Sequence, residues 1–167
     1  MMAVLSAQQV SRDLSGALQR FEIDEPIEVW FGCFNGSEEL SRLCRSLSKP
    51  SRDGATLMLV VCLPDGSPTL SLNDLLDHGS AADRIVLTSV DGTTVAQWPD
   101  TFGDLRAAAD QRGLKSVRVE DEAERAVIGS LQGLNAGDTF VVLVPAELEP
   151  WCVTGWLTQG ARWRESL

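Results

Sequence analysis

Two patterns of apolar residues alternate along the chain. Five short runs are rich in apolar residues, many of them β-branched or aromatic, which predicts strands at 27–31, 56–63, 84–90, 114–119 and 138–144. Other apolar residues recur every three to four positions, which predicts helices near 8–21, 37–48, 71–78, 100–111, 121–131 and 147–157. Strands that alternate with helices at short spacing predict βαβ units. We therefore expect an α/β, three-layer Rossmann-like domain with a mostly parallel sheet of about five to six strands.

The stretch 27–47 shows the repeating unit most clearly. The bulky run Ile27–Phe31 is followed by the break Gly32–Gly36, and Ser37 stands where a helix N-cap is expected. Apolar residues then follow at helical spacing as far as Leu47. This is a strand, a tight turn and an amphipathic helix.

Three further segments give local predictions. Gln8–Phe21 places its apolar residues on one helical face. Ser71 with Asp74 predicts a capping box for a short helix ending at His78–Gly79. The segment Thr93–Trp98 fits either an extra antiparallel strand or a loop.

Length and charge narrow the class of protein. The chain has 167 residues, which fits one domain over 1–167, and a net charge of −10. Such a charge argues against binding to nucleic acid or to an anionic membrane, and favours solubility or a basic partner. No apolar run is long enough to span a membrane, and the N-terminus lacks the basic start of a signal peptide. We expect a cytoplasmic protein.

Four cysteines lie far apart in apolar surroundings, at Cys33, Cys44, Cys62 and Cys152. No C-x-x-C pair occurs, so neither a zinc site nor a redox pair is expected. We expect reduced, buried thiols.

Three motifs carry a family resemblance. Cys33–Ser37 (CFNGS) precedes an amphipathic helix, Ala82–Ser89 reads ADRIVLTS, and Asp121–Ala126 (DEAERA) is followed by Asn135–Leu143 (NAGDTFVVL). In this order they resemble the C-terminal domain of the Mur ligase superfamily, which includes peptidoglycan ligases, cyanophycin synthetase and folylpolyglutamate synthase. The resemblance spans roughly Val10–Glu149 and implies a Rossmann-like fold.

The chain departs from the family pattern where that pattern carries chemistry. Gly32 and Gly36 replace the Asp or His of the first turn, Val90–Thr93 replaces D-N-P-R, and Pro145–Glu149 replaces G-K-G-H-E. No G-x-x-x-x-G-K-[ST] loop is present to hold phosphates. Such a chain cannot run an ATP-dependent ligation alone. It is expected to be a fragment, a subunit completed by another chain, or a descendant without the reaction.

Two strand ends are candidate ligand-binding sites. Helix N-termini and the carboxyl ends of parallel strands favour ligands. The alternative at both places is a polar turn with no ligand. The candidate residues are Asn35, Gly36, Ser37, Ser89, Asp91 and Thr93.

Other polar features predict no catalytic or metal site. The single histidine, His78, precedes Gly79 and suits a helix end, and no G-x-S-x-G elbow accompanies it. The acidic run Glu120–Glu124 suits a solvated helix start, where its carboxylates do not converge on a metal.

The C-terminal segment concentrates three of the five tryptophans, Trp151, Trp156 and Trp163. Tryptophan is enriched at interface hot spots, but it also covers sheet edges. These residues therefore predict either a partner-binding surface or a lid over the core.

Three functions fit these observations. The first is a non-catalytic stand-alone domain that binds a protein partner or regulates one, with no cofactor. The second is a substrate- or nucleotide-binding subunit of a split ATP-dependent amide ligase. The third is a small enzyme of unrelated chemistry, which the fold alone does not exclude. Oligomeric state is left open.

Overall fold

The computed structural model describes residues 5–10, 18–47, 50, 54–64, 81–90, 102–148 and 150–165. Its elements follow one another as β1 (Leu5–Val10), β2 (Leu18–Phe21), β3 (Glu28–Phe34), α1 (Gly36–Ser46), β4 (Leu57–Leu63), β5 (Arg84–Ser89), α4 (Phe102–Gln111), β6 (Ser116–Val119), α5 (Ala123–Gln132), β7 (Thr139–Pro145) and α6 (Pro150–Glu165). The predicted helix at 71–78, with His78, and the segment 93–98 lie outside the described residues.

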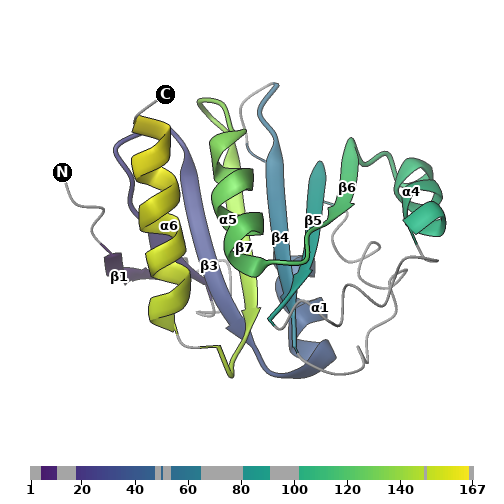
Figure 1. The fold of residues 1–167 in the computed structure, drawn as a ribbon, viewed down its shortest axis with the longest axis horizontal. Coiled ribbons are helices and arrows are strands. Elements are labelled where there is room, and N and C mark those ends of the chain that lie inside the picture. The colour runs from purple at the N-terminus through teal and green to yellow at the C-terminus, as the bar shows by residue number, and fades with distance from the viewer. Residues whose placement is uncertain are drawn as a thin grey trace.

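Seven strands of the described chain form one sheet in the order β1-β2-β3-β7-β4-β5-β6. The strands β3, β7, β4, β5 and β6 run parallel. β2 pairs antiparallel with β3, and β1 pairs antiparallel with β2. Helices α5 and α6 cover one face, while α1 lies on the other (Figure 1). The expected α/β, three-layer, mostly parallel fold is confirmed.

The two central strands explain why the sheet forms. β4 and β7 are buried at every position, so their continuous apolar runs face a helix layer on each side. Successive residues of these two strands point alternately into two hydrophobic cores, one on each face of the sheet. Leu59 and Leu143 belong to the core on the α1 side, whereas Val60 and Val142 belong to the core under α5 and α6.

The helix expected over residues 8–21 is wrong, because this segment contributes β1 and β2 instead. Leu18 and Phe21 are both buried, and three residues of separation put them on one face of a helix but on opposite faces of a strand. Here Leu18 enters the α1-side core and Phe21 the opposite core. β2 pairs with the edge of β3, which raises the strand count above the five to six expected.

Two aspartates of the recognised motifs have structural roles at the start of β4. Asp83 Oδ2 accepts a hydrogen bond from Leu57 N at 2.9 Å, and Asp138 Oδ1 accepts one from Thr56 N at 2.8 Å. Asp138 Oδ2 also accepts from Asn135 N at 2.8 Å. β4 lies between β7 and β5, so these two carboxylates tie three adjacent strands together at the amino edge of the sheet.

Several predicted boundaries shift. The N-cap of α1 is Asn35 rather than Ser37, and the N-cap of α5 is Glu122. α6 runs to Glu165, eight residues beyond its expected end at Leu157. No helix in the described part of the chain is long and apolar enough to cross a membrane.

Candidate functional site

The turn after β3 contains the first predicted ligand residues. Asn35 caps α1 without a side-chain hydrogen bond, and Gly36 has φ +82°, which favours glycine. The backbone N–H of Asn35 donates to Glu39 Oε2 at 3.1 Å. Glu38 and Glu39 both lie in the first turn, so negative charge already occupies this helix start. The turn is therefore poorly suited to a phosphate.

The end of β5 holds the second group. Ser89 and the preceding Thr88 are fully buried, and neither hydroxyl has a hydrogen-bond partner among the described residues. The predicted Asp91 and Thr93 lie outside the described residues. Two strands, β7 and β4, separate β3 from β5, so Ser89 lies about 14 Å from the Asn35 turn. The structure does not bring the two groups together.

A pocket of about 490 Å³ opens beside the end of β5, and we call it the carboxyl-edge pocket. It is lined by Val90, Asp121, Glu122, Ala123, Glu124, Leu148 and Trp156. Strand alternation puts Thr88 on the same sheet face as Val86 and Val90, the face that α5 and α6 cover. A buried hydroxyl without a partner therefore lies next to the strand residue that lines the pocket.

The charges around the carboxyl-edge pocket have opposite effects on a ligand. The first turn of α5 begins there, its N-cap Glu122 makes no side-chain capping bond, and Glu124 places a further carboxylate in that turn. The rim carries exposed carboxylates, while Arg125 pairs with Glu120 at 3.5 Å and with Glu122 at 3.4 Å. The acidic rim thus suits a ligand that carries an amine.

The three C-terminal tryptophans lie on one helix but in two environments. Trp156 is half-buried against the core under α5 and α6, and it lines the carboxyl-edge pocket. Trp151 is 70% exposed and Trp163 is 48% exposed. Trp156 therefore fits the predicted lid over the core, whereas Trp151 and Trp163 fit the predicted surface.

The outer side of α6 forms a shallow hollow of about 530 Å³, which we call the α6 surface. Its residues are Trp151, Thr154, Gly155, Thr158, Gln159, Arg162 and Trp163. A Cβ atom added to Gly155 would meet no atom within 4 Å, so the chain itself leaves this side of the helix open. In Figure 1, α6 stands beside α5 at the front of the sheet.

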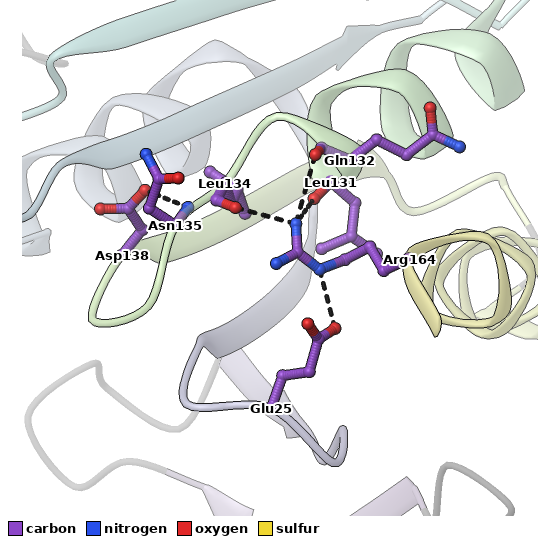
Figure 2. Close-up of polar contacts among 7 residues, drawn as sticks. All are labelled: Glu25, Leu131, Gln132, Leu134, Asn135, Asp138 and Arg164. Atoms are coloured by element: carbon purple, nitrogen blue, oxygen red, sulfur yellow. Dashed lines mark hydrogen bonds and ion pairs between the residues drawn. The ribbon is translucent and has the colours of Figure 1, made fainter. Parts of the chain in front are cut away.

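The inner side of α6 is held firmly. A Cβ on Gly160 would lie 2.8 Å from Leu131 Cδ2 of α5, so the two helices pack closely at this glycine. The Arg164 guanidinium donates to the carbonyl oxygens of Leu131 at 2.7 Å and Leu134 at 2.9 Å (Figure 2). These contacts satisfy carbonyls at the end of α5 and fix which side of α6 faces outward.

The cysteines supply no site. All four are reduced thiols, of which Cys44 and Cys62 are buried and Cys33 and Cys152 half-buried. Burial, and then the nearby Glu39 carboxylate, raise the pKa of Cys33, which keeps this thiol protonated and unreactive. Within the ranges that the structure describes, no three His, Cys, Asp or Glu side chains are grouped so as to hold a metal ion.

Sequence reasoning missed Arg164 and Gly160. Arg164 and Gly160 act through contacts with α5 and with residue 25, which are distant in sequence. Thr88 lies at the same strand end as the candidate Ser89, and the sequence indicated that end as either a ligand site or a polar turn. The one signal available was a polar pair, Thr88–Ser89, that continues an otherwise apolar strand.

No protein-family model matches the chain, and neither does any curated protein. Solved Mur ligase structures share its fold. A murein peptide ligase from Psychrobacter arcticus 273-4 superposes with a TM-score of 0.60 at 14% identity, covering 89% of this chain and 30% of that one. The MurF ligase of Thermotoga maritima, solved in complex with ADP, gives 0.52 at 13% identity, with 87% and 31% covered.

A UDP-N-acetylmuramoyl-L-alanyl-D-glutamate–2,6-diaminopimelate ligase gives a TM-score of 0.50 at 15% identity, covering 76% of this chain and 25% of that one. The chain therefore spans a quarter to a third of the length of these ligases. At such identities the likeness concerns the fold, which is that of a Mur ligase C-terminal-type domain, as its motifs indicate.

Proposed function

We propose that this chain is a non-catalytic protein-interaction module built on a Mur-ligase-type fold, and that its partner binds the α6 surface. The observation that carries the proposal is the exposure of Trp151, at 70%. Tryptophan is costly to leave in water and is enriched among residues that dominate binding energy. A second large aromatic residue, Trp163, flanks the same hollow.

The rigidity of α6 supports this role. Its inner side packs on α5 at Gly160 and is tied to the α5 end by Arg164, so the outer residues sit on a fixed platform. A preorganised surface loses little conformational entropy on binding. The absence of a phosphate-holding G-x-x-x-x-G-K-[ST] loop from the sequence supports a role without ligation chemistry.

The test is a pull-down with tagged chain from its native cell extract. We expect a partner retained by the wild type and lost with Trp151→Ala. Arg106→Ala is the matched control, since Arg106 is exposed on α4 at the other end of the sheet. Each variant is first checked for an unchanged unfolding midpoint. Equal retention by Trp151→Ala and the wild type would remove the α6 surface from the proposal.

A second candidate function is that of a substrate- or nucleotide-binding subunit of a split ATP-dependent amide ligase, with the ligand in the carboxyl-edge pocket. The observation that favours it is the buried Thr88 hydroxyl, which has no partner among the described residues and lies on the sheet face that α5 and α6 cover. An unpaired buried hydroxyl is uncommon and invites explanation by a missing ligand.

Calorimetric titration tests this candidate with two probes, ADP and 2,6-diaminopimelate. The second carries amines, which match the acidic rim. Binding that Thr88→Val weakens about tenfold would support the pocket. Asn35→Ala, at the distant turn, is the control. Heat from neither probe, or weakening by Asn35→Ala alone, would count against the pocket.

A further inference from the structure

The lining of the carboxyl-edge pocket is divided between two chemistries. Four of the described residues that line it are apolar, namely Val90, Ala123, Leu148 and Trp156. The other three carry carboxylates, namely Asp121, Glu122 and Glu124. A group that matches both halves combines an apolar stem with a positive charge at its end, as the side chain of lysine does.

The pocket stays negative when the nearby positive groups are counted. Arg125 pairs with Glu122 at 3.4 Å and so neutralises one lining carboxylate. The start of α5 contributes only about half a positive charge. Asp121 and Glu124 are exposed, and neither makes an ion pair within the part of the chain that the structure describes. These two carboxylates are therefore accessible to a cation.

Trp156 supplies an aromatic face beside these charges. Its ring packs against the core under α5 and α6 and also lines the pocket, so its position is fixed before a ligand arrives. A lysine ammonium over a tryptophan ring is attracted by the ring, and the methylene stem packs on the same apolar surface.

Thr88 adds a buried polar group on the same side of the sheet. Its side chain is fully buried, and its hydroxyl has no hydrogen-bond partner among the described residues. Strand alternation points Thr88 to the same side as Val90, two residues further on, and Val90 lines the pocket. An acceptor that the described chain leaves without a donor therefore lies beneath the pocket, and an ammonium group carries three donors.

The lining also indicates what surrounds the ammonium group. None of the described residues that line the pocket is basic, so a ligand with a carboxylate or phosphate close to its amine would meet like charge there. A lysine inside a polypeptide has its α-amine and its carboxyl group in peptide bonds, and its side chain carries the positive charge alone. The net charge of −10 further attracts a basic partner.

We infer that the carboxyl-edge pocket receives a lysine side chain of a partner protein, with its stem against Trp156 and its ammonium group held by Asp121, Glu124 and Thr88. The inference rests on the proposed function in that the ligand belongs to a protein, but it assigns a site separate from the α6 surface. A pocket of about 490 Å³ also has room for the backbone beside the lysine. One such anchor binds with a Kd of about 0.1–1 mM.

A titration followed by NMR tests the site with the isotope-labelled chain. The probe is lysine with its α-amine acetylated and its carboxyl group converted to a methylamide. We expect the Trp156 indole N–H signal, assigned by its loss in Trp156→Phe, to shift and saturate with a Kd of about 0.1–1 mM. The same probe acetylated on its side-chain amine keeps the stem without the charge and should bind at least about tenfold more weakly. Equal binding of the two probes would overturn the inference.

Three variants test the residues. Glu124→Gln should weaken binding of the probe about three- to tenfold, and Thr88→Val should weaken it about threefold. Glu38→Gln is the matched control, because Glu38 is also an exposed carboxylate in the first turn of a helix and lies outside the pocket. Equal weakening by Glu38→Gln and Glu124→Gln would mean general attraction to an acidic protein and would overturn the site. Unchanged binding by Thr88→Val would overturn it too, since it removes the buried contact.

The source of the amine has its own comparison. Free lysine and 2,6-diaminopimelate should bind at least about fivefold more weakly than the blocked probe, because their carboxylates meet the acidic lining. Tighter binding of either would overturn the polypeptide source and favour the ligase subunit instead.

Failure of this inference can be told apart from failure of the proposed function. A blocked probe that shifts no signal up to about 10 mM overturns the lysine site, while the loss of a partner with Trp151→Ala still supports the α6 surface. A captured partner that Glu124→Gln retains as well as the wild type, and Trp151→Ala loses, also overturns the lysine site alone. Saturable binding of the probe, with a partner retained equally by Trp151→Ala and the wild type, overturns the α6 surface alone.

Discussion

Arg164 and Glu25 lie 139 residues apart in sequence, yet Arg164 Nε donates to Glu25 Oε2 at 2.7 Å. Arg164 is the penultimate residue of α6, and Glu25 lies in the connection between β2 and β3 (Figure 2). The same guanidinium donates to carbonyl oxygens at the end of α5. One side chain thus joins the last helix to its neighbour and to the hairpin end of the sheet.

We expect Arg164→Ala to lower the free energy of unfolding by about 2–4 kcal/mol, because it leaves a partly buried carboxylate and several carbonyl oxygens unpaired. Urea denaturation measures the change. Arg162→Ala, two positions earlier on the exposed side, should alter it by less than about 0.5 kcal/mol at a low protein concentration. A similar loss in both variants would show that the contact contributes little.

Gly160→Val should destabilise the fold by about 1–3 kcal/mol, because a Cβ there meets the buried Leu131 side chain at 2.8 Å. Gly155→Val, on the open side of the same helix, should change stability by less than about 0.5 kcal/mol. Thermal unfolding of both variants in dilute solution makes the comparison. If Gly160→Val and Gly155→Val were equally stable, α5 and α6 would separate at little cost in free energy.

Asp138→Ala should cost about 2–4 kcal/mol, since the carboxylate accepts two backbone hydrogen bonds and is only 4% exposed. Asp138→Asn keeps one acceptor oxygen and should lose less. Chemical denaturation of the three proteins gives the ranking. A loss by Asp138→Asn as large as that by Asp138→Ala would indicate that charge, rather than the number of acceptors, matters at this position.

Thr88→Val should raise the free energy of unfolding by about 1 kcal/mol, because it removes a buried hydroxyl that has no partner among the described residues. Ser130→Ala is the contrasting control. Ser130 is equally buried, but its Oγ accepts a hydrogen bond from Arg118 Nη2 at 3.1 Å, so its loss should destabilise. Denaturation of both proteins with and without ADP shows whether the ligand makes the wild type as stable as Thr88→Val.

Burial raises the pKa of the Cys44 thiol from its ordinary value of 9.0 to about 12. The unfolded chain loses this proton near pH 9, whereas the native chain keeps it up to about pH 12. The native state therefore binds more protons in that range, and stability falls as pH rises through it.

Below pH 9 the contribution of this thiol is constant. The stability difference between the wild type and Cys44→Ala should be flat there and should shrink by up to about 4 kcal/mol toward pH 12. Unfolding curves at several pH values test this. A difference that stays constant through pH 11 would mean that Cys44 titrates as an exposed thiol.

The central strands could be predicted because their physical signal is local. Continuous apolar runs at 57–63 and 139–145 have no polar face, so they fit a sheet covered on both sides. The strand–turn–helix unit around Gly36 could be predicted for the same reason. The motif aspartates 83 and 138 were recognised as a family pattern, while their role at the start of β4 came only from the structure.

The N-terminal hairpin could not be predicted from its own residues. Leu18 and Phe21 satisfy the spacing of a helix face and also that of a strand buried on both sides. The exposed edge of β3 decides between them, because it supplies backbone partners that a helix cannot use.

The sequence alone determined the fold class and the order of most elements, because these follow from short-range patterns of apolar residues. It also showed three tryptophans gathered in the C-terminal segment. The tertiary structure alone decided which tryptophans face water. Their exposure depends on the rotation of α6 about its own axis. The close contact with α5 at Gly160 and the bond from Arg164 to Glu25 set that rotation. Contacts between residues far apart in sequence leave no local pattern to read.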